Sequence, residues 1–266
     1  MLVGYVQMKT IFGRRQENLV RALTILEASS DLGVDLIVLP ELFNTGYAFR
    51  NRKELEKLSE TIPDGLTSKA LMSFAEENGL HVCAGISERH GKNFYNSAIL
   101  VGPGGPRGLY RKTHLFAEER RWFKPGDTGF RVFSVDGTRI GIIICFDWFF
   151  PESVRTLALR GAEVVCHPAN LVLPYCQTAL LGTAIQNRVF IITANRIGAE
   201  RGLRFTGRSQ IIGPDMRVLA RSGLNEGLKV VDIDPADARD KHVTELNDVF
   251  EDRRPGLYSP ISSGHL

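Results

Sequence analysis

Cys145 is the residue whose type and position most clearly suggest chemistry. It follows four residues, 141–144, that read as a buried strand, and Pro151 then prevents a strand from continuing while it permits a helix to begin. A thiol at such a strand-to-loop corner can be presented to a substrate, and the free backbone N–H of Phe146 is the first candidate donor to an oxyanion. Without a histidine or an acid beside it, this run alone is more typical of a small buried core cysteine.

Two charged residues also stand where predicted strands end. Glu41 follows the strand 36–39 and Pro40, and the apolar residues after it indicate a pocket wall, which raises the pKa of a carboxyl towards the working range of a general base. A glutamate after a proline can equally cap a loop or face solvent. Lys112 begins an irregular segment that reaches Gly129, and loops of this length in a compact domain are usually functional, although most lysines are simply solvated.

Three further polar residues lie at a similar corner or in this loop. Asn170 follows another predicted buried strand and is a candidate substrate contact. Glu119 lies three residues before Trp122; a mixed charge run is normally a solvated face, but an acid beside an aromatic residue can be drawn into a pocket. His114 is an alternative partner for Cys145, and which side it faces depends on whether the preceding strand continues through it.

The elements that must position these residues alternate between strands and helices. We expect strands at 2–7, 36–39, 81–87, 97–101, 108–111, 130–135, 139–144, 163–167, 190–195, 205–212, 218–221 and 227–233. We expect helices at 16–32, 51–58, 67–78, 152–160 and 176–187. This alternation, interrupted by hairpins, predicts an α/β sandwich with two sheets face to face and helices outside. We expect a single domain, 1–266, with residues 247–266 as a polar C-terminal arm.

The composition narrows the class of protein. With 266 residues, 43% of them hydrophobic, the chain can bury a substantial core, and its net charge of +3 is too small and too dispersed to imply nucleic acid or an anionic membrane as partner. There is no basic leader and no apolar run near the roughly 20 residues that span a bilayer, so we expect a soluble, cytoplasmic protein. The four cysteines show no metal-ligand spacing, so we expect reduced thiols and no metal.

Three motifs, taken together, resemble those of the nitrilase superfamily of carbon-nitrogen hydrolases. They are Leu39-Pro40-Glu41, Tyr110-Arg111-Lys112-Thr113-His114, and the run from Cys145 to Glu152 with the segment 157–162. They occur in the order typical of that family, and the resemblance extends from the first strand to about Tyr258. It implies a Glu-Lys-Cys site on an αββα four-layer sandwich, no cofactor, and association through the helical layers into a homodimer or larger homo-oligomer.

The resemblance also implies a role for each residue. Glu41 would be the general base, Cys145 the nucleophile, and Lys112 the cation that stabilises an oxyanion together with the Phe146 N–H. Glu119 would hold the substrate amide and orient Lys112. This division agrees with the chemistry, because a thiol with a pKa near 8.5 needs an adjacent base and a cation to attack an unactivated amide, and a histidine is then unnecessary.

The expected reaction is hydrolysis of a small aliphatic amide to a carboxylic acid and ammonia through a Cys145 thioester. Phe146-Asp147 resembles the amidase and carbamoylase branches, so an N-carbamoyl compound is an alternative substrate. The longer run after Cys145, together with the segment 167–172, also resembles small thermophilic members described as aliphatic nitrilases, so a small aliphatic nitrile is another alternative. Transfer of the acyl group to an amine uses the same thioester and stays open.

Aromatic residues near the motifs predict a compact apolar pocket. The predicted lining residues are Tyr47, Phe116, Trp148 and Phe149. The residues predicted to contact substrate are Phe146, Tyr47, Asn170 and Trp148. A papain-like hydrolase is disfavoured, because such an enzyme needs a Cys-His pair with the cysteine near the mature N-terminus, and Cys145 lies in the middle of the chain. A non-catalytic binding protein has no need for the three motif residues together.

Overall fold

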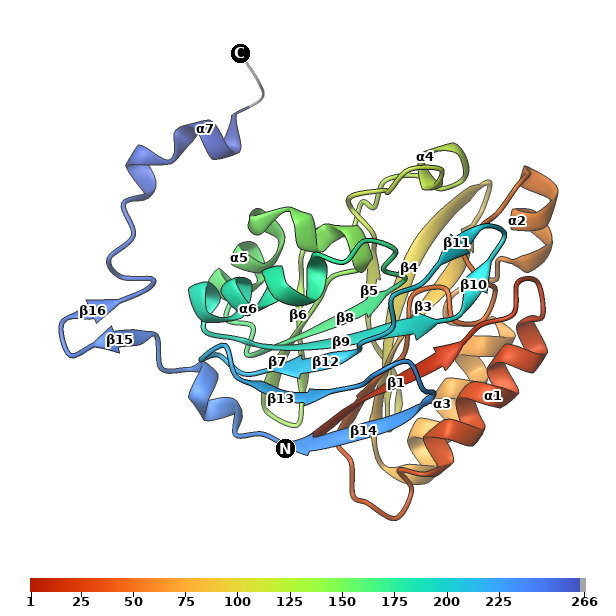
Figure 1. Ribbon diagram of the computed structural model, residues 1–266, viewed down its shortest axis with the longest axis horizontal. Coiled ribbons are helices and arrows are strands. Elements are labelled where there is room, and N and C mark those ends of the chain that lie inside the picture. Colours follow the sequence, from red (N-terminus) through yellow and green to blue (C-terminus); the bar gives the residue numbers. More distant parts are fainter. Residues whose placement is uncertain (264–266) are drawn as a thin grey trace.

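The computed structural model describes residues 1–263 and has the architecture of a sandwich (Figure 1). The strands of the main sheet are β1 (Leu2–Lys9), β2 (Leu36–Val38), β3 (His81–His90), β4 (Asn93–Gly102), β5 (Gly105–Arg111), β6 (Val132–Val135), β7 (Thr138–Ile142), β8 (Val164–Ala169), β9 (Phe190–Ile197), β12 (Gln210–Ile212), β13 (Val218–Arg221) and β14 (Gly227–Asp232). The helices are α1 (Arg15–Glu27), α2 (Arg52–Leu58), α3 (Leu66–Asn78), α4 (Glu119–Trp122), α5 (Pro151–Leu159), α6 (Cys176–Asn187) and α7 (Ser259–Ser262). No helix within 1–263 is long and apolar enough to cross a bilayer.

The strands form one path that folds back on itself. Its order is β5-β4-β3-β2-β1-β9-β8-β7-β6, with β14 beside β1 and the β12–β13 pair beside β9. β1 pairs in parallel with β2 through Val3, Gly4 and Tyr5, and its last residues, Met8 and Lys9, pair with β9. The path therefore divides at β1 into two halves that face each other.

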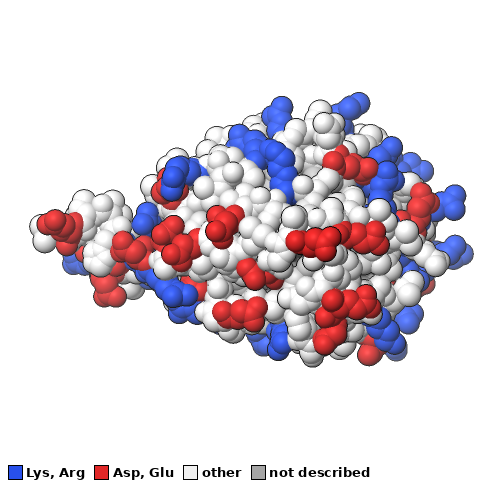
Figure 2. Space-filling view, turned by 90° about the horizontal axis from the view of Figure 1, so that it is seen from below, with Lys and Arg blue, Asp and Glu red and all other residues white. Residues whose placement is uncertain are grey.

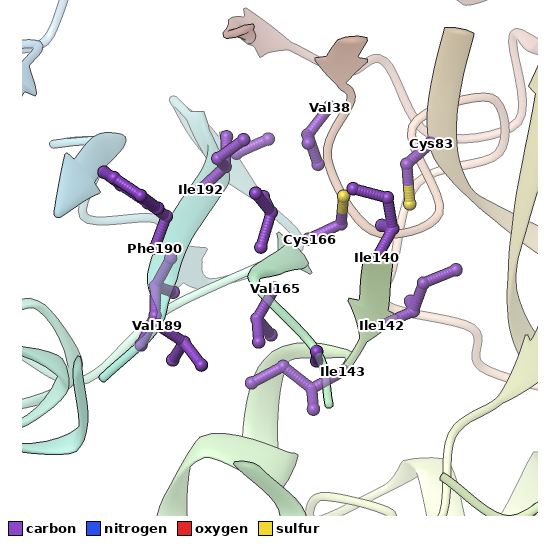
Figure 3. Close-up of a cluster of buried hydrophobic side chains, with 14 of the residues drawn as sticks. Val38, Cys83, Ile140, Ile142, Ile143, Val165, Cys166, Val189, Phe190 and Ile192 are labelled. Atoms are coloured by element: carbon purple, nitrogen blue, oxygen red, sulfur yellow. The ribbon is translucent and has the colours of Figure 1, made fainter. Parts of the chain in front are cut away.

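The core lies between these two halves. Val38 and Cys83 from the first half belong to the same buried cluster as Ile142, Cys166 and Ile192 from the second half (Figure 3). Burial and the neighbouring Cys166 raise the pKa of the Cys83 thiol well above its ordinary value, so these two side chains lie close together between the two inner faces. Strand alternation places every second side chain in this layer and the others under the outer helices.

The helices form the two outer layers. Leu19 and Leu26 of α1 and Leu71 of α3 pack with Ile37 and Val82 on the outer face of the first half. α5 and α6 cover the second half on the opposite side of the molecule (Figure 1). The prediction of an αββα sandwich is therefore confirmed.

Several boundaries of the predicted helices, strands and loops were wrong. α1 ends at Glu27 and not at Leu32, because the hydroxyl of Ser29 bonds the carbonyl of Leu26 and the chain turns there. The predicted strand at 205–212 is short, beginning only at Gln210. The irregular segment after Lys112 contains the short helix α4.

The last part of the chain projects from the body (Figure 1). It contains β15 (His242–Thr244), β16 (Asn247–Asp248) and α7, and in Figure 2 it extends to the left with both acidic and basic side chains. Its base is anchored by Lys241, whose Nζ bonds the carbonyls of Asn187 and Arg188 at the end of α6. A separate arm at 247–266 stays a prediction, and its residues 264–266 lie outside the described part.

Candidate active site

Three strand ends bring Glu41, Lys112 and Cys145 together. Glu41 lies three residues after β2, Lys112 directly after β5, and Cys145 three residues after β7. Lys112 Nζ bonds Glu41 Oε1 at 2.7 Å, and both side chains are fully buried. Cys145 is 5% exposed and lies close enough to Glu41, Lys112 and Glu119 for all three charges to act on the pKa of its thiol.

Glu119 completes this cluster from α4. Its Oε1 lies 2.7 Å from Lys112 Nζ and accepts a hydrogen bond of 2.6 Å from the hydroxyl of Tyr47. The ammonium of Lys112 therefore lies between two buried carboxylates. Such a lysine is held in one position, since both partners fix the direction of its N–H groups.

Two glycines allow the backbones of the site to approach closely. A Cβ on Gly85 of β3 would lie 2.5 Å from the Cα of Glu41, so only glycine lets the Glu41 corner rest on this strand. A Cβ on Gly126 would lie 1.9 Å from the carbonyl oxygen of Arg111, next to Lys112, and the Gly126 N–H donates to the Lys112 carbonyl at 2.8 Å. The turn Pro125-Gly126-Asp127 therefore closes the loop onto Lys112.

Burial and charge set the protonation states. Burial disfavours the charged form of Lys112, but the negative charges of Glu119 and Glu41 outweigh it and raise the pKa of this lysine, which stays an ammonium. Burial raises the pKa of Glu119 to about 7, against the opposing effect of Lys112. Burial, with the charge of Glu41, also raises the pKa of the Cys145 thiol well above its ordinary value. The resting nucleophile is therefore a neutral thiol that needs a base.

The backbone of Cys145 is strained. Its φ of 41° lies in the left-handed region, which is unfavourable for a residue other than glycine, and it opens a short 3₁₀ turn over Cys145–Phe149. The carbonyl of Cys145 accepts a hydrogen bond of 3.1 Å from His167 Nε2. Burial lowers the pKa of His167 to about 4, so its ring is neutral, and Thr193 Oγ1 supplies the partner for Nδ1 at 3.0 Å. This buried pair supports the turn from β8 and β9.

Asp147 fastens the same turn from the other side. Its Oδ2 accepts hydrogen bonds from the Ile144 N–H at 2.9 Å and from the Tyr110 hydroxyl at 2.7 Å. Its Oδ1 lies 3.0 Å from the His114 backbone nitrogen and 2.7 Å from His114 Nδ1. Tyr110 and His114 flank Lys112 in the sequence, so one buried carboxylate joins the nucleophile turn to the lysine segment.

Asn96 is a member of the site that the sequence reasoning missed. Its Nδ2 lies 2.7 Å from Glu41 Oε1 and 3.4 Å from Glu119 Oε2, and its backbone carbonyl accepts the Lys112 N–H at 2.8 Å. It is fully buried on β4. The predicted strand began at Ser97, whereas β4 begins at Asn93, so Asn96 fell outside it. The signal that could have found Asn96 is a polar side chain inside a buried strand next to β5.

Comparison with known proteins identifies the family of this chain. A family model described as carbon-nitrogen hydrolase matches residues 2–242. The chain belongs to the carbon-nitrogen hydrolase family. The resemblance to the nitrilase superfamily, predicted from the three motifs, is confirmed.

The relatives of this carbon-nitrogen hydrolase are named for different activities. The nitrilase of Pyrococcus abyssi is 47% identical over 257 residues, which cover 96% of this chain and 98% of that protein. The (R)-stereoselective amidase of a Pseudomonas species is 36% identical over 238 residues, covering 88% and 85%. The fold is similar to that of a variant of the amidase from Nesterenkonia sp. AN1, whose active-site cysteine has added acrylamide, with a TM-score of 0.83, 26% identity and 98% and 99% coverage.

The four residues predicted to contact substrate in this carbon-nitrogen hydrolase do not share one environment. Tyr47 reaches the site through Glu119, and Asn170 Nδ2 bonds the backbone carbonyl of Glu41 at 2.9 Å, so that this amide supports the Glu41 corner. The ring of Phe146 contacts that of Phe116 at 5.0 Å between centroids. Trp148 packs against the sandwich core.

His114, the alternative partner of the nucleophile in this carbon-nitrogen hydrolase, is engaged elsewhere. Its ring bonds Asp147 and stacks on Phe150 with 3.7 Å between centroids. Within 1–263 no group of three or more His, Cys, Asp or Glu side chains is placed to hold a metal ion.

A cavity of about 390 Å³ adjoins the catalytic cluster of this carbon-nitrogen hydrolase. Its lining residues are Tyr47, Ala48, Phe49, Arg50, Phe116, Ala117, Glu118, Glu119, Arg121, Trp122, Val172, Arg201 and Leu203. Tyr47 and Glu119 belong to both the cavity and the cluster. The predicted lining residues Tyr47 and Phe116 are in its wall, whereas Trp148 and Phe149 are not, and Phe149 is 56% exposed.

Proposed function

We propose that this carbon-nitrogen hydrolase converts a small aliphatic amide into a carboxylic acid and ammonia through a thioester on Cys145. The observation that carries the proposal is the Lys112 ammonium fixed between Glu41 and Glu119 beside a buried, neutral thiol. A neutral thiol needs a proton acceptor, and the negative oxygen formed from an amide carbonyl needs a cation. The cluster supplies both.

Glu41 is the proposed general base. Its Oε1 is occupied by Lys112 and Asn96, while its Oε2 is buried and has no hydrogen-bond partner within the described residues. A buried carboxylate oxygen that lacks a donor is a favourable acceptor for the thiol proton of Cys145.

The proposed reaction has two halves. Cys145 attacks the carbonyl carbon as Glu41 takes the thiol proton, and Lys112 with the Phe146 N–H stabilises the oxyanion. Collapse of this intermediate expels ammonia, which receives the proton. Glu41 then deprotonates a water molecule, which attacks the thioester and releases the carboxylic acid. Glu119 holds the substrate amide and orients Lys112.

A small aliphatic nitrile is the second candidate substrate, favoured by the 47% identity to a protein named nitrilase. Attack on a nitrile gives a thioimidate, and two water molecules are then consumed before the acid is released. The same catalytic groups serve both reactions.

We also propose that the protein is cytoplasmic and assembles into a homodimer or larger homo-oligomer. A groove of about 970 Å³ separates α5 and the end of α6 from the projecting C-terminal segment. Exposed apolar side chains surround it, among them Leu159 at 43%, Val243 at 67% and Ile261 at 63% exposure. A second copy would cover this apolar surface.

An ammonia-release screen tests the proposed reaction. It would compare short aliphatic amides with the matching nitriles and N-carbamoyl compounds, with mass spectrometry of the peptide that contains Cys145. We expect ammonia from the amides and an acyl adduct on this peptide. Ammonia only from nitriles or only from N-carbamoyl compounds would replace the amide proposal by that alternative, and no ammonia from any of them would overturn it.

A further inference from the structure

We propose that the cavity beside Glu119 is an acyl-group site for a neutral, apolar substituent larger than that of a short aliphatic amide. This inference rests on the proposed amide hydrolysis and names the substrate class of the same site. The cavity shares Tyr47 and Glu119 with the catalytic cluster, and Glu119 is one hydrogen bond of 2.7 Å from Lys112. An amide held by Glu119 would therefore extend its acyl part into this space.

The second connection leads to the nucleophile. Phe116 lines the cavity, and its ring contacts that of Phe146 at 5.0 Å between centroids. Phe146 follows Cys145 directly and supplies the proposed oxyanion N–H. The cavity thus borders the catalytic cluster through Glu119 and the nucleophile turn through Phe116.

The volume exceeds what a short amide needs. The cavity measures about 390 Å³, within the range of roughly 300–1,000 Å³ typical of sites for larger ligands. Acetamide has four non-hydrogen atoms, and at roughly 30 Å³ for each water-sized group it would occupy about a third of this space. The rest would hold water against apolar walls, which a longer acyl group would displace favourably.

The wall is chemically suited to such a group. Its lining includes aromatic and branched aliphatic side chains, all of which are partly exposed except the buried Phe49. They are Tyr47, Phe49, Phe116, Trp122, Val172 and Leu203. Apolar surface of this kind gains free energy when a ligand removes it from water.

The charged residues at the rim are mostly engaged with each other. Arg201 bonds Glu54 with both terminal nitrogens, at 2.7 and 2.8 Å. Arg121 pairs with Glu118 at 3.1 Å, and both are exposed. Arg50 is exposed at the mouth. No charged lining residue other than Glu119 is buried, so the wall provides no desolvated ion partner for a charged substrate tail.

A series of amides tests this inference in the intact enzyme. For acetamide, butyramide and hexanamide we expect kcat/KM to rise about fourfold for each added methylene, which corresponds to about 0.8 kcal/mol. The monoamide of adipic acid and 6-aminohexanamide have a similar length but carry a charge, and we expect both to react at least tenfold more slowly than hexanamide. If kcat/KM is flat or falls with length, or if a charged amide is preferred, the acyl-site proposal is wrong.

A variant with a smaller cavity gives a second measurement. Val172→Phe fills part of the space and should lower the ratio of kcat/KM for hexanamide to that for acetamide at least fivefold. Val218→Phe makes the same substitution on β13, outside the cavity, and should leave this ratio unchanged. Equal ratios in the two variants would place the acyl group elsewhere.

Binding separates failure of this inference from failure of the proposed function. In the Cys145→Ala protein, calorimetry should show hexanamide binding at least tenfold more tightly than acetamide. If no amide is hydrolysed by the wild type, the proposed function falls, and this binding ratio still decides the acyl site. If short amides are hydrolysed but the ratio is near one, the acyl site alone is refuted.

Discussion

Lys112 is the centre of the site because its ammonium is bonded to two carboxylates at once. Glu41 and Glu119 each lie 2.7 Å from its Nζ, yet their surroundings differ. Glu41 is held by Asn96 and keeps one oxygen free, whereas Glu119 is held by Tyr47 and faces the cavity. Two carboxylates in different environments can take different roles, one as base and one as a fixed partner of the substrate.

Glu119 should give the enzyme a pH dependence near neutrality. Burial raises its pKa to about 7, so its carboxylate is lost as the pH falls through that value. We expect kcat/KM to rise with pH with an apparent pKa near 7, and this limb to be absent in Glu119→Gln. The variant should turn over about 10- to 100-fold more slowly, which is the effect of one hydrogen bond to a charged group.

The same shift affects stability. The pKa of Glu119 is higher in the folded protein than its ordinary 4.5, so the native carboxyl keeps a proton that the unfolded one loses. Its contribution is therefore fully present below pH 4.5 and is lost as the pH rises through about 7. Thermal unfolding of Glu119→Gln between pH 4.5 and 8 should lack this component. A fully active variant with the wild-type pH profile would show that Glu119 takes no part in turnover.

Asn96 should matter for turnover although it carries no charge. Asn96→Leu keeps the shape but removes the donor to both glutamates, and we expect kcat to fall at least tenfold because each hydrogen bond to a charged group contributes about 1.5–3 kcal/mol. Asn225→Leu, at an exposed position, serves as the control in steady-state kinetics and thermal unfolding. Wild-type kcat in a folded Asn96→Leu protein would show that Asn96 is not needed to order the two carboxylates.

At the scale of single residues, the motifs predicted the charged residues and the cysteine that the structure brings together, but not the polar side chains that bond them. Glu41, Lys112 and Cys145 follow predicted strand ends, and the resemblance of the three motifs to the nitrilase superfamily implied their joint role and that of Glu119. Asn96 reaches the site because β4 pairs with β5 in the register Ser97 to Arg111, and a register across strands cannot be read from one strand. The hydrogen bond of Asn170 could not be read from the sequence for a similar reason, since its partner is a backbone carbonyl 129 residues away, and its contact with substrate stays a prediction.

At the scale of elements, the turn after β7 must be held against its own backbone strain. His167 supports the carbonyl of Cys145 from β8, and Asp147 ties the turn to the segment around Lys112. The corner itself was predictable from the apolar run and the following proline. The supports were not, because they come from strands that are distant in the sequence.

Asp147→Asn should loosen this turn. The amide nitrogen cannot accept hydrogen bonds, so at least one donor among Ile144, Tyr110 and His114 is left unpaired in a buried site. We expect the free energy of unfolding to fall by about 2–4 kcal/mol, measured by chemical denaturation, with lower kcat in the folded variant. Asp64→Asn, at an exposed position, is the control. Equal free energies of unfolding of the two variants would contradict the role of Asp147 in holding this turn.

At the scale of the whole molecule, the αββα order followed from the alternation of elements, because apolar faces of sheets and helices must be buried against each other. The C-terminal segment was predicted only as a polar arm, and within the described residues it packs against the body through Phe250 while other apolar side chains stay exposed. Its apolar side chains Leu246 and Leu257 are 91% and 72% exposed. Exposed groups of this kind are usually covered by a partner.

Removal of residues 247–266 should therefore change the assembly. We expect light scattering to give a lower molar mass for the truncated protein than for the full chain at the same concentration, because the apolar surface along α5 loses the segment that would reach a second copy. Circular dichroism should confirm that the truncated protein is folded. An unchanged molar mass would show that the arm takes no part in assembly.

The central claim is that Cys145, activated by Glu41 and Lys112, forms the bond to the substrate. The most direct measurement is ammonia release by Cys145→Ala, with Cys83→Ala as a control that removes another buried thiol outside the catalytic cluster. We predict that Cys145→Ala folds with wild-type stability and releases no ammonia above the uncatalysed rate, while Cys83→Ala stays active. A folded Cys145→Ala protein that hydrolyses amides at the wild-type rate would contradict the account.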